Sequence, residues 1–138
     1  MELTNKVIVD TDFISLYLKG DLLTKKYVED MMTNGYLFTT TSITSSELLY
    51  GAYKKEWKKT RIEVLKQFLE KIGVIGFNYK HSLVYGKLRA TMRKSGKEIG
   101  FADTAIASIC IEEQMPLFTF NIKHFIDIHN LELYNKDF

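Results

Sequence analysis

The chain has 138 residues, of which 46% are hydrophobic and 26% charged, with a formal net charge of +2, so we expect one globular domain spanning residues 1–138. A single cysteine excludes an internal disulfide, and no apolar run reaches the length of about 18 residues that a membrane-spanning helix needs. The N-terminus lacks the basic and apolar segments of a signal peptide, which favours a cytoplasmic location.

An unbroken apolar run near the N-terminus leads directly into acidic residues. Residues 7–9 predict a strand buried on both faces, followed at once by a helix that ends near Gly20. Asp10 stands at the C-terminal end of this strand, where open α/β sheets bind ligands. Asp12 is expected to cap the helix, because acidic side chains accept hydrogen bonds from free N–H groups at helix starts.

Helices and strands are expected to alternate along the rest of the chain. Apolar residues at helical spacing predict helices over residues 22–32, 44–57, 60–72, 78–92 and 101–113, with a short turn or helix over 121–125. Aromatic or β-branched runs predict strands over residues 36–40, 74–77 and 117–120, with a fifth, edge strand over 131–134. This order predicts an α/β fold with a mainly parallel sheet of about five strands and helices on both faces.

Oxygen-bearing side chains stand at element ends that converge at one edge of such a sheet. They are Asp10 after the first strand, Glu47 after the second, Asp103 in the first turn of the 101–113 helix, and Asn121 after the fourth strand. Three carboxylates and an amide suit a hard divalent cation, Mg²⁺ or Mn²⁺. The histidines and the cysteine form no zinc pattern, so His124 and His129 are expected at the surface or in turns.

Each of these side chains also has a structural explanation. Thr44-x-x-Glu47 is a capping-box pattern, which explains Glu47 as well as metal binding does. A helix dipole favours Asp103, although its apolar neighbours make a lone carboxylate costly there. Asn121 suits a cap of the following turn. Asp10 is the hardest to explain structurally, because it ends a buried strand.

Basic and aromatic residues gather in parts of this nearly neutral chain. Residues 53–61 and 87–97 are rich in Lys and Arg, as in a phosphate-binding rim or an ordinary solvated helix face. Tyr50, Tyr53 and Trp57 are spaced on one side of a helix. Core or interface packing explains this spacing better than base stacking does.

Four segments resemble, in order, the motifs of PIN-domain ribonucleases, most of all the VapC-type toxins of bacterial and archaeal toxin–antitoxin pairs. The segments are residues 7–14, 44–52, 100–107 and 117–121, with Phe125 and Leu131 following. The similarity covers nearly the whole chain, in the right order and at the right intervals. One such motif would be weak evidence, whereas four in order are strong evidence.

The resemblance implies a single PIN-like domain that cleaves RNA with Mg²⁺ or Mn²⁺, forms a homodimer and has a cognate antitoxin. The resemblance assigns metal binding and catalysis to Asp10, Glu47, Asp103 and Asn121. Many relatives have an acid where this chain has His124. The identity of the fourth metal ligand and the presence of a second metal ion therefore stay open. The candidates for contacts with RNA phosphates are Lys54, Lys55, Arg89 and Arg93.

In such a site, metal-bound hydroxide would attack an RNA phosphate in line, with Asp10 and Asp103 as the principal ligands. Glu47 would complete the shell or orient the water, while Asn121 and Thr119 would position ligands by hydrogen bonds.

Two alternative functions stay open. A haloacid-dehalogenase-like phosphohydrolase also has Asp-x-Asp after an apolar strand, but it needs a later acidic pair that the segment after residue 120 does not supply. A non-catalytic RNA- or protein-binding module could share the fold.

Overall fold

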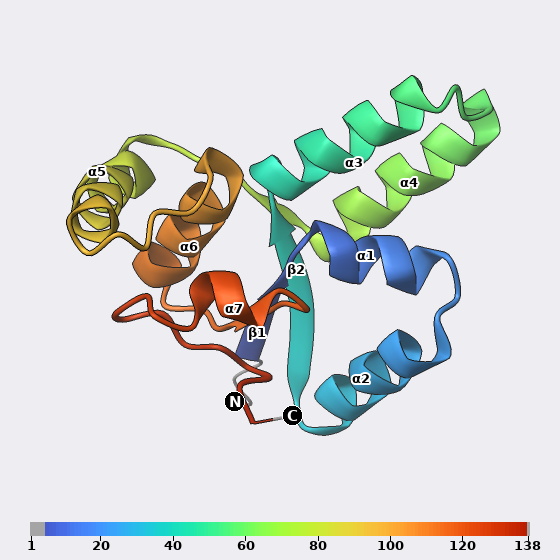
Figure 1. Cartoon of the computed structure of the whole chain (residues 1–138). Coiled ribbons are helices and arrows are strands. Elements are labelled where there is room, and N and C mark those ends of the chain that lie inside the picture. The colour runs from blue at the N-terminus through green and yellow to red at the C-terminus, as the bar shows by residue number, and fades with distance from the viewer. Residues whose placement is uncertain (1–4, 138) are drawn as a thin grey trace.

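A parallel β-sheet lies at the centre of the computed structural model, which describes residues 5–137 (Figure 1). Within these residues, the sheet has four strands in the order β3-β2-β1-β4. The strands are β1 (Asn5–Val9), β2 (Tyr36–Thr41), β3 (Val74–Ile75) and β4 (Leu117–Phe118). The helices are α1 (Thr11–Leu18), α2 (Leu22–Thr33), α3 (Ser42–Lys54), α4 (Lys59–Ile72), α5 (Tyr79–Lys94), α6 (Phe101–Glu113) and α7 (Ile122–Phe125).

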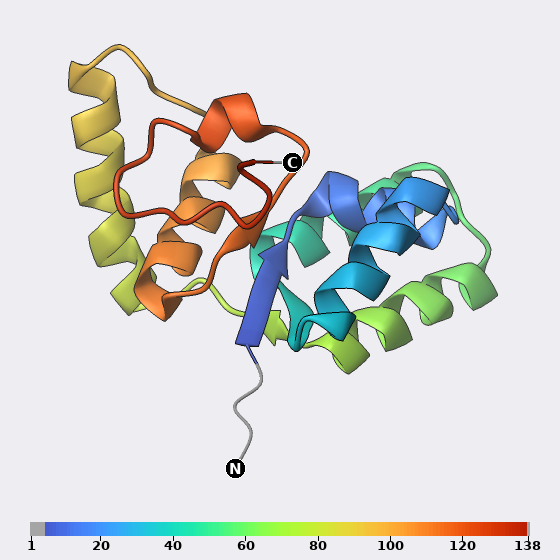
Figure 2. The same ribbon diagram turned by 90° about the horizontal axis from the view of Figure 1, so that it is seen from below.

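Strand β1 is buried on both faces, as its β-branched run predicts. Ile8 pairs with Thr39 of β2 on one side and with Leu117 of β4 on the other, both in parallel. Because side chains alternate along a strand, Ile8 packs against α5 and α6, whereas Val7 and Val9 pack against α1 and α2. The predicted α/β class, with a parallel sheet and helices on both faces, is confirmed (Figure 2).

Helices α3 and α4 form an antiparallel pair that projects from the C-terminal end of β2 (Figure 1). Ala52 of α3 and Ile62, Leu65 and Leu69 of α4 are buried between them. The far end of the pair therefore lies away from α6 and α7, whereas the start of α3 lies at the end of β2 (Figure 1). Across the described residues, no helix has both the length and the apolar character needed to span a membrane.

The predicted fifth strand is wrong, because residues 131–134 meet the sheet through a single parallel bridge between Leu133 and Leu117. Strand β4 is also shorter than predicted and ends at Phe118. The side chain of Asn135 accounts for this early end. Its Oδ1 accepts from the Thr119 N–H at 3.3 Å and its Nδ2 donates to the Thr119 C=O at 2.8 Å. The Asn135 side chain therefore makes the hydrogen bonds to the Thr119 backbone that a neighbouring strand would otherwise make.

Two predicted helix starts are wrong. Helix α3 begins at Ser42 rather than Thr44, with Thr41 as its N-cap, and the Thr41 hydroxyl accepts from the Thr44 N–H at 3.3 Å. Helix α4 begins at Lys59, after an N-cap, Lys58, that makes no side-chain capping bond. A Thr/Ser-rich segment offers several residues that could cap a helix, and the end of the preceding strand decides among them.

Candidate active site

A cavity of about 140 Å³ lies at the C-terminal end of β1. Helices α1 and α3 begin beside it, at the ends of β1 and β2 (Figure 1). All four residues predicted from the sequence line it, together with three neighbours. The lining residues are Asp10, Thr11, Asp12, Glu47, Asp103, Ile106 and Asn121. The structure therefore brings together side chains from four separate parts of the chain.

Asp10 forms the buried floor of this cavity, with an exposed fraction of 6%. Its Oδ1 accepts from the Phe13 N–H at 3.2 Å, and its Oδ2 accepts from the Thr119 hydroxyl at 2.5 Å. Burial raises the pKa of Asp10 from 3.8 to about 6, although both hydrogen bonds oppose the rise. The nearby carboxylates of Asp12 and Asp103 add to it. The N-cap of α1 is thus Asp10, and the prediction that Asp12 fills this role is wrong.

Glu47 lies at the exposed rim of the cavity, in the second turn of α3. Its Oε1 accepts from the Thr11 hydroxyl of α1 at 2.6 Å. Because the N-cap of α3 is Thr41, Glu47 stands beyond the capping-box position, and the capping explanation for it is wrong. Glu47 is instead a carboxylate held near Asp10 by a neighbouring helix.

Asp103 and His124 form a pair on the opposite rim. Nδ1 of His124 in α7 lies 2.8 Å from Oδ2 of Asp103 in α6. An ionised carboxylate only accepts hydrogen bonds, so the shared proton belongs to Nδ1 of the imidazole. His124 and His129 are exposed, as predicted. Sequence reasoning missed the pairing, and the one signal for it was that the resemblance leads one to expect an acid at the position of His124.

Asn121 connects the floor to the rim. It stands at the N-cap position of α7, but the predicted side-chain cap is wrong, because that bond is not formed. Its Nδ2 donates instead to Oδ2 of Asp12 at 3.1 Å. Its backbone N–H donates to the Thr119 hydroxyl at 3.0 Å, and that hydroxyl in turn donates to Asp10. Thr119 therefore fixes Asp10, in line with its predicted positioning role.

The charge of the cavity fits a cation. Asp10, Asp12, Glu47 and Asp103 all line it, while none of its described lining residues is Lys or Arg. A set of carboxylate and amide oxygens is what hard divalent cations prefer. In the described part of the chain, however, no three His, Cys, Asp or Glu side chains are arranged to enclose an ion. Glu47 and Asp103 are each hydrogen-bonded through one carboxylate oxygen, to Thr11 and His124, which leaves the other oxygen of each for a cation.

The predicted phosphate contacts lie outside the cavity. Lys54 and Lys55 are at the far end of α3, and Arg93 is exposed in the last turn of α5. Arg89 is engaged by Glu98, with 2.9 Å between Nε and Oε1. The role of these four residues therefore stays a prediction.

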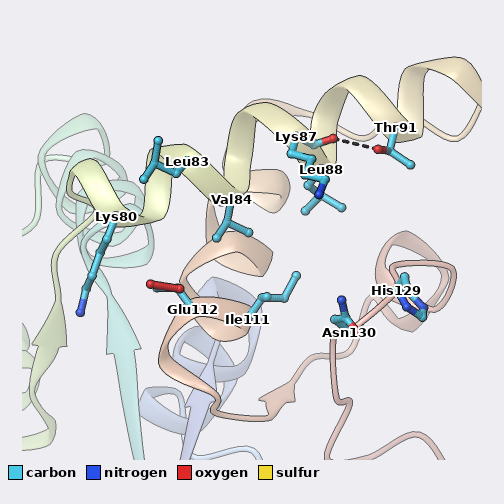
Figure 3. Close-up of a pocket in the computed structure, with 10 residues that line it drawn as sticks. All are labelled: Lys80, Leu83, Val84, Lys87, Leu88, Thr91, Ile111, Glu112, His129 and Asn130. Carbon is cyan, nitrogen blue, oxygen red and sulfur yellow. Dashed lines mark hydrogen bonds between the residues drawn. The ribbon is translucent and has the colours of Figure 1, made fainter.

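A second cavity, of about 490 Å³, lies between α5 and α6 and is bordered by the loop that carries His129 and Asn130 (Figure 3). Leu83 and Val84 of α5 and Ile111 of α6 line it. None of the predicted catalytic residues is among its described lining residues. Its apolar walls offer no cluster of metal-binding oxygens, so the smaller carboxylate cavity is the candidate active site.

Comparisons with known proteins find relatives that match most of the chain. Residues 7–130 match the family model of the PIN domain. Ribonuclease VapC2 of Haemophilus influenzae is 30% identical over 120 residues, covering 87% of this chain and 89% of the relative. Ribonuclease VapC2 of Rickettsia felis is 36% identical over 108 residues, covering 78% and 81%. The crystal structure of VapBC2 from Rickettsia felis bound to a promoter DNA fragment superposes with a TM-score of 0.80 at 32% identity, covering 93% of this chain and 96% of that one.

Proposed function

The chain belongs to the PIN-domain family, and on this premise we propose that it is an endoribonuclease, the toxin of a toxin–antitoxin pair. The observation that carries the proposal is the convergence of Asp10, Glu47, Asp103 and Asn121 on one cavity. Relatives named ribonuclease VapC support the reaction class. The match to a PIN domain leaves the haloacid-dehalogenase alternative without support.

The residues of the cavity suit a bound Mg²⁺ or Mn²⁺. Asp10 and Asp103 would be the principal ligands, and Glu47 would complete the set. Since the amide nitrogen of Asn121 bonds to Asp12, its amide oxygen is the atom left to bind. An ion held there would lower the pKa of a coordinated water and would offset the charge of the attacked phosphate.

The surrounding residues prepare Asp10 for this role. The Phe13 N–H and the Thr119 hydroxyl hold its two oxygens, so Asp10 keeps its orientation before any ligand arrives. With a pKa of about 6, Asp10 is mostly ionised at neutral pH and can bind a cation. Glu47, exposed and hydrogen-bonded only through its tip to Thr11, is suited to orienting the attacking water.

The proposed partners follow from the family. Several relatives were solved as VapBC complexes, which supports a cognate antitoxin for this chain.

We also infer a single nuclease domain over residues 1–138 that works as a homodimer in the cytoplasm, where its RNA substrate is found. Light scattering of the purified protein tests the homodimer, and a monomer at micromolar concentration would contradict it.

RNA cleavage tests the proposed function. A pool of cellular RNA is incubated with Mg²⁺, Mn²⁺ or EDTA and either wild type, Asp103→Asn or Asp127→Asn. Asp127 is a matched control, because this exposed acid of the C-terminal segment pairs with Lys97 and lies outside the cavity. We expect metal-dependent cutting by wild type and Asp127→Asn and none by Asp103→Asn. Cutting that persists in EDTA or in Asp103→Asn would contradict the proposal.

A further inference from the structure

Two tyrosines of α3 are exposed, so neither packs in the core, and the predicted packing at an interface stays a prediction. Tyr50 has an exposed fraction of 67% and Tyr53 one of 57%. Single exposed apolar residues are common at protein surfaces and need no explanation by themselves. Tyr50 and Tyr53 have different neighbours, however, because they lie on different faces of α3.

Tyr50 and Lys54 share a helix face with Glu47. They follow Glu47 by three and seven residues, and residues so spaced lie on one face of an α-helix. Nζ of Lys54 lies over the Tyr50 ring, 5.9 Å from its centroid. The face therefore presents a cavity carboxylate, then an aromatic ring, then an ammonium group, over a helix length of about 10 Å.

Tyr53 and Lys55 face other parts of the protein. Tyr53 lies near Lys66 of α4 and contributes to the raised pKa of that lysine. Lys55 lines a separate cavity, of about 150 Å³, with Leu18 of α1 and Trp57. These two side chains are therefore directed toward α4 and α1, away from the carboxylate cavity. Tyr53 is chemically matched to Tyr50 and serves as an internal control for it.

From this arrangement we propose that Tyr50 is a stacking platform for a base of single-stranded RNA next to the cleaved bond, with Lys54 holding the adjacent phosphate. The inference rests on the proposed nuclease function and names two residues that would bind the RNA beside the cleaved bond. Proteins bind single strands by stacking bases on exposed aromatic rings beside basic groups that follow the phosphates. A duplex keeps its bases stacked on one another, so it cannot use such a platform.

Binding of a labelled RNA tests the platform. Fluorescence anisotropy is measured in EDTA, to prevent cutting, with a fluorescein-labelled twelve-nucleotide oligo(A) and with a twelve-base-pair RNA duplex. Tyr50→Leu should weaken binding of the single strand roughly tenfold, the effect of one lost base stack. Tyr50→Phe and the control Tyr53→Leu should stay within about twofold of wild type, as should duplex binding by Tyr50→Leu.

The salt dependence of binding tests the cation. Lys54→Gln should reduce the slope of log affinity against log salt by about one unit. The control Lys80→Gln should leave the slope unchanged, because Lys80 pairs with Glu113 and lines the cavity between α5 and α6. Equal effects of Tyr50→Leu and Tyr53→Leu would overturn the inference. So would equal loss of duplex binding, or no binding of the single strand by wild type. If wild type cuts RNA while Tyr50→Leu binds normally, the inference alone fails; if wild type does not cut, the proposed function fails.

Discussion

The floor and the rim of the carboxylate cavity are built differently. Asp10, on the floor, is buried and has both oxygens held by Phe13 and Thr119. Glu47 and Asp103, on the rim, are more exposed, and each is bonded through one oxygen to a single side chain. The floor carboxylate is therefore oriented before a ligand binds, whereas the rim can adapt. A site of this kind has one rigid anchor and several adjustable ligands.

The rigid anchor has a cost in folding stability that the rim does not have. Burial of the Asp10 carboxyl disfavours its charged form, which raises its pKa to about 6. Because this folded-state pKa lies above the unfolded value, the stability that Asp10 contributes is fully present below the unfolded pKa and is lost as the pH rises through about 6. At neutral pH, the folded protein thus holds the Asp10 carboxylate in its charged form. The burial of that charge lowers the stability of the folded state.

The largest expected effect on stability comes from neutralising the floor. Asp10→Asn should stabilise the metal-free protein at pH 8 by up to about 3 kcal/mol, and by less at pH 5, where Asp10 is already mostly protonated in the folded state. Urea unfolding in EDTA at both pH values measures this. Asp127→Asn should show no such pH dependence. A gain for Asp10→Asn that is the same at both pH values, or a loss at pH 8, would show that Asp10 is not destabilised by burial.

A smaller effect is expected at the rim. His124→Ala should weaken Mn²⁺ binding about tenfold, because the imidazole no longer orients Asp103 and such supporting contacts typically contribute that much. Isothermal titration calorimetry measures the affinity, and His129→Ala serves as the control, since His129 lies beside the other cavity. Unchanged or tighter binding by His124→Ala would mean that His124 competes with the ion for Asp103 instead of positioning it.

The floor could be predicted from the sequence, because local signals determine it. An apolar β-branched run predicts β1, and Asp10 follows that run directly. The apolar residues of α6, which recur at helical spacing, likewise predict its bounds, Phe101–Glu113, and place Asp103 in its first turn. Each of these conclusions needs only neighbouring residues and the rule that parallel strands end at one edge of a sheet.

The rim could not be predicted in detail, because it depends on contacts between distant segments. His124 and Asp103 are 21 residues apart, and no periodic pattern connects α6 with α7. The start of α3 depends on where β2 ends, so Thr41 rather than Thr44 caps it. Tyr50 and Tyr53 are both tyrosines of one helix, and the proximity of Tyr53 to Lys66 of α4 follows only from the packing of α4 against α3.

The most direct test of the central claim is the cleavage rate of Asp10→Asn at saturating RNA across a range of Mn²⁺ concentrations, beside wild type and Glu47→Gln. If Asp10 is the rigid anchor of a metal-dependent nuclease site, Asp10→Asn should cut at least about a hundredfold more slowly than wild type at every concentration, since metal catalysis contributes several kcal/mol. Glu47→Gln should lose less. A rate for Asp10→Asn that reaches the wild-type value at high Mn²⁺, or that exceeds the rate of Glu47→Gln, would contradict the claim.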